Sequence, residues 1–427
     1  MQPELGILAD DLTGATDTGL QFAKSGWRTH VSLNWSVSSA CDVLVLDTDS
    51  RARPMPEARK RVFVATQKLR AAGVERFYKK IDSTVRGNLG AEIEATLEAL
   101  DAPLALICPA FPQLGRTVRD GVILVRGLPL EQTEFAQDPL WPATTASIED
   151  ILRRQTSLEI ASLALIEVRR GPAHLRNRLK ELVGEGVRLV IADAESAIDL
   201  RCLIEAVRQS HDPILPVGSA GLAEWLVSSL SRPARVPGEV SLSRDPILVI
   251  AGTMNRLGLV QVARLVESGA RLIRVSPEAA LNEPEKVART TAEEVRQQDR
   301  DGGCIVLALA DPTANPPDLG LIARERGLGL AQATERLVNV LGQVTSLATD
   351  AVTPAVLILT GGDTARAVCT ALGANGLDVY REAAPGIPIS LLDGGRWDGL
   401  PVVTKAGGFG GPDTLVQVVK LLQEMRR

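Results

Sequence analysis

The chain has 427 residues, of which 45% are hydrophobic, 23% are charged and 3% are aromatic, and its formal net charge is −5 at pH 7. A negative net charge and few aromatic side chains argue against nucleic acid and against an anionic membrane surface as main partners. The length exceeds what one hydrophobic core usually supports, so we expect two domains.

The five cysteines are widely spaced and include no C-x-x-C pair, which is typical of a reducing compartment and not of a structural zinc site. The three histidines are also dispersed, so we predict no metal site built by the protein itself. The sequence starts with a strand-like segment rather than a signal-peptide pattern, and no apolar run has the length of a membrane span. We therefore expect a cytoplasmic protein with no membrane partner.

Short apolar runs alternate with amphipathic segments along almost the whole chain, a pattern that predicts an α/β fold with mostly parallel sheets flanked by helices. In the first half we predict strands at 5–9, 30–33, 43–47, 76–81, 104–108, 189–192 and 214–217. In the second half we predict strands at 247–251, 272–275, 304–309, 355–359 and 401–405. The clearest predicted helices are 88–100, with Asn88 as its N-cap, and 331–347.

One segment stands out as a linker between domains. Residues 231–239 are rich in proline and charge, so we predict one domain over residues 1–230 and a second over residues 245–427. Residues 311–317 contain three prolines and are predicted to form a loop within the second domain.

The first predicted strand is followed at once by two carboxylates, Asp10 and Asp11. Their mutual repulsion is tolerable if a hydroxylated ligand, a cation or an arginine lies opposite them, so a role in ligand binding is one interpretation. The alternative is that Asp11 or Thr13 simply caps the following helix.

The segment 79–88 offers a richer set of polar groups after another predicted strand. Asp82, Ser83 and Arg86 lie in the expected loop, and the planar fork of arginine suits a carboxylate ligand. The alternative is an internal Arg86–Asp82 ion pair that shapes the loop, and both interpretations can hold at once.

Residues 109–118 contain two prolines and a glycine and are predicted to form a shaped loop. Arg116 in this loop is a candidate second contact for an anion, although a lone arginine is more often a solvated or structural charge. We interpret Asp17, Glu92 and Asp120 as surface or capping groups rather than catalysts.

Three glycine- or hydroxyl-bearing turns follow predicted strands in the second domain, at 252–255, 361–364 and 407–411. Together they suggest a cradle for phosphate, because glycine lets backbone N–H groups approach an anion closely. Each turn alone is a weak signal, since glycine also occurs in ordinary turns. The sequence contains neither a P-loop motif nor a G-x-G-x-x-G motif after the first strand, which argues against those nucleotide folds.

Six segments spread over the whole chain together resemble one known family, the four-carbon acid sugar kinases. They are A-D-D-L-T-G-A-T-D-T-G (9–19), K-I-D-S-T-V-R-G-N-L-G (80–90), P-A-F-P-Q-L-G-R-T-V (109–118), G-S-A-G-L-A (218–223), G-G-D-T-A (361–365) and A-G-G-F-G (406–410). The resemblance implies transfer of phosphate from ATP, with Mg²⁺, to the terminal hydroxyl of a four-carbon sugar acid. It also implies that the N-terminal domain holds the acid, the C-terminal domain holds the nucleotide, and the active site lies in the cleft between them.

Carried over position by position, the resemblance implies that Asp10, Asp11 and Arg86 are catalytic and contact the sugar acid, with Asp82 and Ser83 beside them. Arg116 remains a further candidate for binding the acid. The implied nucleotide contacts are Thr253, Asn255, Gly361, Gly362, Asp363, Thr364, Gly407 and Gly408. The chain departs from the family at 252–258, where many relatives have G-S-x-S followed by a threonine.

The pair K-I-D-S-T-x-R-G and G-G-D-T is more similar to D-threonate kinases than to 3-oxo-tetronate kinases. Kinases of 3-oxo-tetronate, erythronate or another small hydroxy acid such as glycerate remain open. Two other classes are also open, a sugar-acid-binding module without turnover and a nicotinamide-dependent oxidoreductase. The expected partners are small molecules, with a homodimer open as an assembly.

Overall fold

The computed structural model describes residues 2–37, 40–137, 141–228, 242–298, 302–314 and 316–426. The chain divides into two compact units, Met1–Arg235 and Val236–Arg427, and each is described by itself. The predicted linker at 231–239 lies outside the described residues. No helix in the described ranges is long and apolar enough to cross a membrane.

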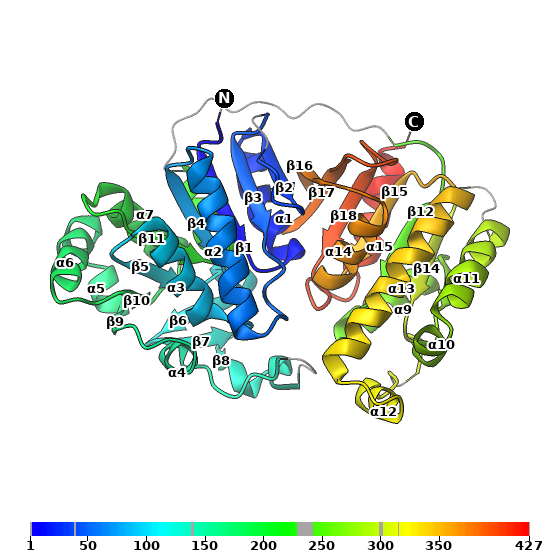
Figure 1. Ribbon diagram of the computed structural model, residues 1–427, viewed down its shortest axis with the longest axis horizontal. Coiled ribbons are helices and arrows are strands. Elements are labelled where there is room, and N and C mark those ends of the chain that lie inside the picture. The colour runs from blue at the N-terminus through cyan, green and yellow to red at the C-terminus, as the bar shows by residue number, and fades with distance from the viewer. Residues whose placement is uncertain are drawn as a thin grey trace. The chain divides into compact units, whose positions relative to one another are not determined.

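The first unit is built on a parallel sheet whose strand order is β2-β3-β1-β4-β11-β5-β10-β9 (Figure 1). The strands are β1 (Leu5–Ala9), β2 (Thr29–Ser32), β3 (Val43–Asp47), β4 (Arg76–Lys80), β5 (Ala105–Cys108), β9 (Ile160–Leu163), β10 (Leu189–Ala192) and β11 (Leu215–Gly218). Nearly all residues of β1, β3 and β5 are buried, as expected for strands with helices on both faces.

Helices cover both faces of this sheet. They are α1 (Leu12–Lys24), α2 (Met55–Ala71), α3 (Leu89–Leu100), α4 (Ile148–Arg153), α5 (Leu165–Val168), α6 (Pro172–Gly184), α7 (Ala197–Gln209) and α8 (Ala220–Ser228). The crossovers β1-α1-β2 and β3-α2-β4 run in opposite directions along the sheet, so right-handed connections place α1 and α2 on opposite faces. Accordingly α2 packs against α3 (Figure 1), and α1 packs against α8.

A small antiparallel sheet in the first unit was not predicted. It consists of β6 (Arg116–Arg119), β7 (Val122–Val125) and β8 (Leu128–Pro129). The expectation of a loop up to residue 118 was therefore wrong at its end, since Arg116 begins β6. These strands are too short for a clear alternating pattern, and the Asp193 carboxylate supports their first turn by accepting hydrogen bonds from the N–H groups of Asp120 and Gly121.

The second unit has a sheet with the order β13-β14-β12-β15-β18-β17-β16. Its strands are β12 (Ile247–Ala251), β13 (Arg271–Arg274), β14 (Cys304–Ala308), β15 (Val356–Thr360), β16 (Gly376–Ala384), β17 (Ile387–Asp393) and β18 (Pro401–Lys405). The five strands β13, β14, β12, β15 and β18 are parallel to one another, whereas β17 is antiparallel to both β18 and β16. The β16–β17 hairpin was not among the predicted elements.

The helices of the second unit are α9 (Arg256–Glu267), α10 (Pro277–Asn282), α11 (Pro284–Gln298), α12 (Leu319–Glu325), α13 (Leu330–Ala351), α14 (Gly362–Ala371) and α15 (Thr414–Glu424). The long helix α13 packs against α11 and α14, and α9 packs against α15 (Figure 1). A core of buried side chains that includes Val249, Val262, Ile358 and Leu415 joins α9 and α15 to the strands.

The predicted α/β fold is confirmed, and each predicted strand lies within one residue of an observed strand. Asn88 directly precedes α3 as predicted, but its side chain does not cap the helix. Instead its Nδ2 donates to the carbonyl oxygens of Ser50 and Arg53, at 3.0 and 2.9 Å. The expected position of the active site between the domains stays a prediction.

Candidate functional site

The polar segments predicted in the first unit follow neighbouring strands of one sheet. Ala9 at the end of β1 is paired with Asp47 of β3 on one side and with Lys80 of β4 on the other. Lys80 is in turn paired with Gly218 of β11. Because these strands are parallel, the segments that follow them emerge at the same edge of the sheet, where α/β folds usually bind ligands.

Asp10 and Asp11 are joined by one arginine, Arg51, which follows β3. The Arg51 guanidinium donates to both oxygens of Asp10, from Nε at 2.7 Å and from Nη2 at 2.9 Å. It also donates to both oxygens of Asp11, from Nη1 at 2.7 Å and from Nη2 at 2.8 Å. The repulsion between the adjacent carboxylates is thus offset by a shared cation that makes two bidentate pairs.

The two carboxylates differ in how many of their acceptor sites are occupied. Asp11 is the N-cap of α1, accepting from the Gly14 N–H at 2.8 Å and from the Thr13 hydroxyl at 2.8 Å in addition to Arg51. Those four bonds fill the roughly four lone-pair positions of a carboxylate. Asp10 accepts only from Arg51 among the described residues, so half of its acceptor capacity remains. The capping interpretation of Asp11 is therefore confirmed.

Charge around Asp10 keeps this carboxyl group ionised. Burial raises the pKa of Asp10, but Arg51, Lys79 and Lys80 lower it by more, so that its pKa lies below the usual value. Burial likewise opposes the charged form of Arg51, yet the neighbouring carboxylates raise the pKa of this guanidinium well above its usual value. At neutral pH both Asp10 and Arg51 therefore carry their charges.

Asp82 and Arg86 form the internal ion pair that the sequence suggested. Arg86 donates from Nε at 2.7 Å and from Nη2 at 3.2 Å to the two oxygens of Asp82, which also accepts from the Thr84 hydroxyl. Burial raises the pKa of Asp82, but Arg86 and Arg51 outweigh burial and hold that pKa well below its usual value. Because Arg51 lowers the pKa of Asp82, the Asp10–Asp11–Arg51 cluster and the Asp82–Arg86 ion pair interact electrostatically.

Ser83 and Arg116 meet beside this ion pair. The Arg116 Nη1 donates to the Ser83 hydroxyl oxygen at 2.5 Å, while its Nε is buried and has no hydrogen-bond partner in the part of the chain that is described. Burial lowers the pKa of Arg116. The ring of Phe135, in the 3₁₀ turn η3 (Glu134–Gln137), lies 5.7 Å from the guanidinium carbons of both Arg86 and Arg116. Two guanidinium groups therefore gather around one aromatic ring.

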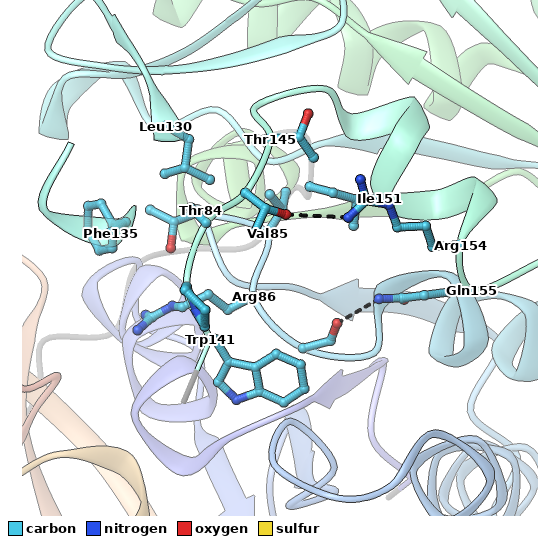
Figure 2. A pocket seen from close by; sticks show the side chains of 14 residues that line it. Thr84, Val85, Arg86, Leu130, Phe135, Trp141, Thr145, Ile151, Arg154 and Gln155 are labelled. Carbon is cyan, nitrogen blue, oxygen red and sulfur yellow. Dashed lines mark hydrogen bonds between the residues drawn. The ribbon is translucent and has the colours of Figure 1, made fainter. Parts of the chain in front are cut away.

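A pocket of about 130 Å³ adjoins Arg86 (Figure 2). Figure 2 shows Thr84, Phe135 and Trp141 at this pocket together with Arg86. Gln155 on the far side fixes the loop, since its Nε2 donates to the Gly87 carbonyl at 3.0 Å and its Oε1 accepts from the Gly90 N–H at 2.8 Å. The pocket thus has an aromatic wall, from Phe135 and Trp141, and two guanidinium groups, from Arg86 and Arg154.

A second buried ion pair lies under the first cluster. Lys79 Nζ is 2.7 Å from Glu92 Oε2, and both side chains are almost fully buried. Burial raises the pKa of Glu92, as does nearby Asp10, although Lys79 lowers it. The interpretation of Glu92 as a surface or capping group was wrong, because Lys79 points inward from β4 and requires an anion beside it.

In the second unit the three predicted turns also follow neighbouring strands. Ala251, Thr360 and Lys405, the last residues of β12, β15 and β18, are paired side by side. The turns approach so closely that a Cβ atom on Gly252 would collide with the Thr364 hydroxyl. A Cβ atom on Gly407 would lie 2.6 Å from Thr253 Oγ1. The structure therefore brings the three predicted turns together.

Each predicted residue of these turns has a definite place. Gly361 has φ of +99° and precedes α14, whose first turn contains Gly362, exposed Asp363 and buried Thr364. Asn255 is the N-cap of α9, accepting from the Leu257 N–H at 2.9 Å. Helix α14 thus begins with backbone N–H groups at the glycine turns, an arrangement that favours anions.

Two basic residues that organise these sites, Arg51 and Lys405, were not predicted from the sequence. Arg51 could have been found, because two adjacent carboxylates require a counter-ion and the strand before Arg51 is the neighbour of β1. Lys405 is buried, and its Nζ donates to the carbonyl oxygens of Ala406, Gly407 and Phe409. The position of Lys405 at the end of a predicted strand, directly before a glycine-rich turn, could have indicated its role.

Among the described residues, no group of three or more His, Cys, Asp or Glu side chains is arranged to hold a metal ion. Magnesium in nucleotide sites is usually held by one or two carboxylates together with the phosphates of the substrate. The exposed carboxylate of Asp363, in the first turn of α14, fits that limited role.

Comparisons with known proteins give matches to both units of the chain. Residues 5–226 match a family described as a sugar-binding N-terminal domain, and residues 248–415 match one described as a nucleotide-binding C-terminal domain. A D-threonate kinase from Salmonella typhimurium is 36% identical over 98% of this chain and 98% of its own length. A 3-oxo-tetronate kinase from Cupriavidus necator is 33% identical over 99% of this chain and 98% of its own length.

Solved structures show the same fold. A Salmonella typhimurium protein with 25% sequence identity has a TM-score of 0.78 and covers 97% of this chain and 98% of its own. A Haemophilus influenzae protein with 24% identity has a TM-score of 0.70, with 98% and 99% coverage. The similarity therefore extends over both units.

The Arg51 cluster generates a prediction about stability. Arg51→Met leaves two adjacent buried carboxylates without their counter-ion, so we expect the free energy of unfolding to fall by about 3–5 kcal/mol. Urea denaturation measures this change. Arg53→Met is the matched control, because the Arg53–Asp49 pair is more exposed and its loss is expected to cost at most about 1 kcal/mol. Equal losses for the two variants would contradict the assigned role of Arg51.

Proposed function

This chain belongs to the four-carbon acid sugar kinase family, and we propose that it phosphorylates the terminal hydroxyl of a four-carbon sugar acid, D-threonate, using ATP. The observation that carries the proposal is the gathering of Asp10, Asp82, Arg86 and Arg116 at one sheet edge of the first unit. The three turns that meet in the second unit support a separate site for the nucleotide phosphates. The enzyme is then a phosphotransferase with an alcohol group as acceptor.

The first unit offers complementary groups for a sugar acid. Arg86 and Arg116, on the ring of Phe135, supply positive charge for the carboxylate of the acid. Asp10 retains acceptor capacity and is ionised, so it can accept hydrogen bonds from the sugar hydroxyls. An acid held by its carboxylate at one end presents its terminal hydroxyl at the other.

The roles of the two adjacent carboxylates differ in this proposal. Asp10 receives the proton of the attacking hydroxyl, because its remaining acceptor positions can face the substrate. Asp11 holds Arg51 and the first turn of α1, since its own positions are filled. The Arg51 charge stabilises the ionised form of Asp10 and so makes this carboxylate a weak base. That is adequate for phosphoryl transfer, which depends mainly on positioning and on charge stabilisation.

The second unit supplies the nucleotide site in this proposal. Thr253, Gly361, Gly362 and Thr364 contact the phosphates of ATP together with Gly407 and Gly408, and Asn255 keeps the adjoining turn in place as a helix cap. Mg²⁺, with Asp363 as its protein ligand, supplies neutralisation of phosphate charge when bound. A cytoplasmic location and a homodimer stay predictions.

The proposed function is tested by ADP release in a coupled assay with Mg·ATP. The panel of acceptors contains D- and L-threonate, D- and L-erythronate, 3-oxo-tetronates and glycerate. We expect the highest kcat/KM with D-threonate, because curated relatives named D-threonate kinase reach 36% identity over nearly the whole chain. A higher value with a 3-oxo-tetronate or D-erythronate would reassign the substrate. Binding of ADP and of an acid without turnover would favour a binding module.

Arg86 is expected to act on the acid and not on the nucleotide. Arg86→Ala should raise KM for the acid by about 30-fold or more, since a charged hydrogen-bonded pair is lost, and should leave KM for ATP within about twofold. Arg86→Lys keeps a positive charge beside Asp82 and tests whether the planar guanidinium is needed to bind the carboxylate of the acid. Arg154→Ala is the control, because Arg154 lines the same pocket but bonds Thr144. Equal effects on both KM values would exclude the role of Arg86.

The difference between Asp10 and Asp11 can be measured with matched amide substitutions. Asp10→Asn should lower kcat by about 10²–10⁴-fold, the usual range for loss of a proton acceptor, because no carboxylate then faces the attacking hydroxyl. Asp11→Asn keeps a good helix cap but weakens the hold on Arg51, so its main effect should be on unfolding in urea. A larger loss of kcat for Asp11→Asn than for Asp10→Asn would reverse the assignment.

A further inference from the structure

Lys405 is an ammonium group buried in the second unit without a carboxylate beside it. It ends β18, and its side chain is among the largest fully buried ones. Its Nζ donates to the carbonyl oxygens of Ala406 at 2.8 Å, Gly407 at 3.0 Å and Phe409 at 3.2 Å. All three of its donor positions are thus directed at the backbone of one turn, residues 406–411.

A second buried side chain holds the same turn from α9. Gln261 Nε2 donates to the carbonyl oxygens of Phe409 at 2.9 Å and Gly411 at 2.8 Å. Gln261 is fully buried. Lys405 and Gln261 together therefore draw four carbonyl oxygens of the turn toward the protein interior.

The direction of these carbonyls determines the direction of the amides. In a trans peptide the C=O of one residue and the N–H of the next point in opposite directions, and the described residues include no cis peptide bond. The inward carbonyls of Ala406, Gly407 and Phe409 thus turn the N–H groups of Gly407, Gly408 and Gly410 outward. Within the described ranges, none of these three N–H groups has a hydrogen-bond partner.

The outward face of the turn adjoins other polar groups. A Cβ atom on Gly407 would lie 2.6 Å from Thr253 Oγ1, and one on Gly408 would lie 3.3 Å from the side-chain amide of Asn255. A Cβ atom on Gly258 would lie 2.5 Å from Thr253 Cγ2 and 3.0 Å from the Gly407 carbonyl oxygen. Glycine at 258 therefore lets α9 approach the turn.

We propose that Lys405 is a positioning residue for phosphate binding, which holds the carbonyls of the 406–411 turn inward so that its amides face the phosphates of the nucleotide. This inference rests on the proposed function only in taking a nucleotide as the ligand. Successive backbone N–H groups that face one way form an effective anion site. Lys405 does not touch the phosphate; it acts through the turn and through its charge.

The charge of Lys405 supports the same conclusion. Burial lowers the pKa of Lys405 to about 7, and no ion pair to this residue is found in the described part of the chain. A buried charge is costly unless an opposite charge compensates it. A phosphate bound to the outward amides supplies that compensation and favours the protonated form of the lysine.

The test compares binding of ADP and of adenosine to the full-length chain by titration calorimetry or ligand-observed NMR. Lys405→Met keeps the length of the side chain and removes its donors and its charge. We expect ADP to bind about tenfold or more weakly, with adenosine affinity changed less than about twofold, because the turn contacts only phosphates. KM should accordingly rise for ATP and not for the acid. Lys420→Met, an exposed substitution on α15, is the matched control.

Gln261→Met provides a second variant if Lys405→Met fails to fold. It removes the two bonds to Phe409 and Gly411 and leaves Lys405 in place, so ADP affinity should fall by a smaller factor and adenosine affinity should stay constant. Unchanged ADP affinity in the folded Lys405→Met protein, or in Gln261→Met where the former is unfolded, would overturn the inference. Equal losses for ADP and adenosine would also overturn it.

These outcomes separate the inference from the proposed function. If the wild-type protein binds ADP but phosphorylates no acid, the proposed function is overturned. The role of Lys405 is then still decided by comparing the ADP and adenosine affinities of the wild type and the variants. A wild-type protein that does not bind ADP overturns the inference itself. Normal turnover with unaltered ADP affinity in Lys405→Met overturns the inference alone.

Discussion

The sharing of Arg51 by Asp10 and Asp11 is the interaction on which the first unit depends. Two adjacent carboxylates at the end of a buried strand repel each other, and only a cation with several fixed donors can bond all four of their oxygens. Arg51 lies beside these carboxylates because it follows β3, which pairs with β1. Asp10 thereby remains ionised inside the protein and keeps acceptor positions for a ligand.

The second unit also contains a buried charged group, in this case the cation of Lys405. Lys405 is buried among backbone carbonyls and has no carboxylate partner in the described residues, so its charge is compensated only partly by peptide dipoles. In both units a charged residue lies at a strand end, since Asp10 directly follows β1 and Lys405 is the last residue of β18. The first unit has paired charges that leave hydrogen-bonding capacity for a polyhydroxylated acid. The second has unpaired positive charge and free amides that suit phosphate.

The strands and the two clusters of site residues were predictable, because buried parallel strands are continuous apolar runs and their ends lie at one edge of a sheet. The Arg86–Asp82 ion pair was predicted, but the other partners were not. Glu92 and Phe135 are single residues without a periodic signal, and only the need of Asp10 and Asp11 for a counter-ion pointed to a residue such as Arg51. The strands β6 to β9 and β16 were missed because their short or partly exposed segments lack a clear apolar pattern. Most of β17 is buried, but Pro388 interrupts its apolar run.

The central claim is that the acid is anchored at its carboxylate by Arg86 and Arg116, so that its far end receives the phosphate. The position of the phosphate in the product tests this most directly, by phosphorus–proton correlation NMR of the compound formed from D-threonate. The account predicts coupling of the phosphorus to the methylene protons of the terminal carbon. Coupling to the methine proton of either inner carbon would contradict it.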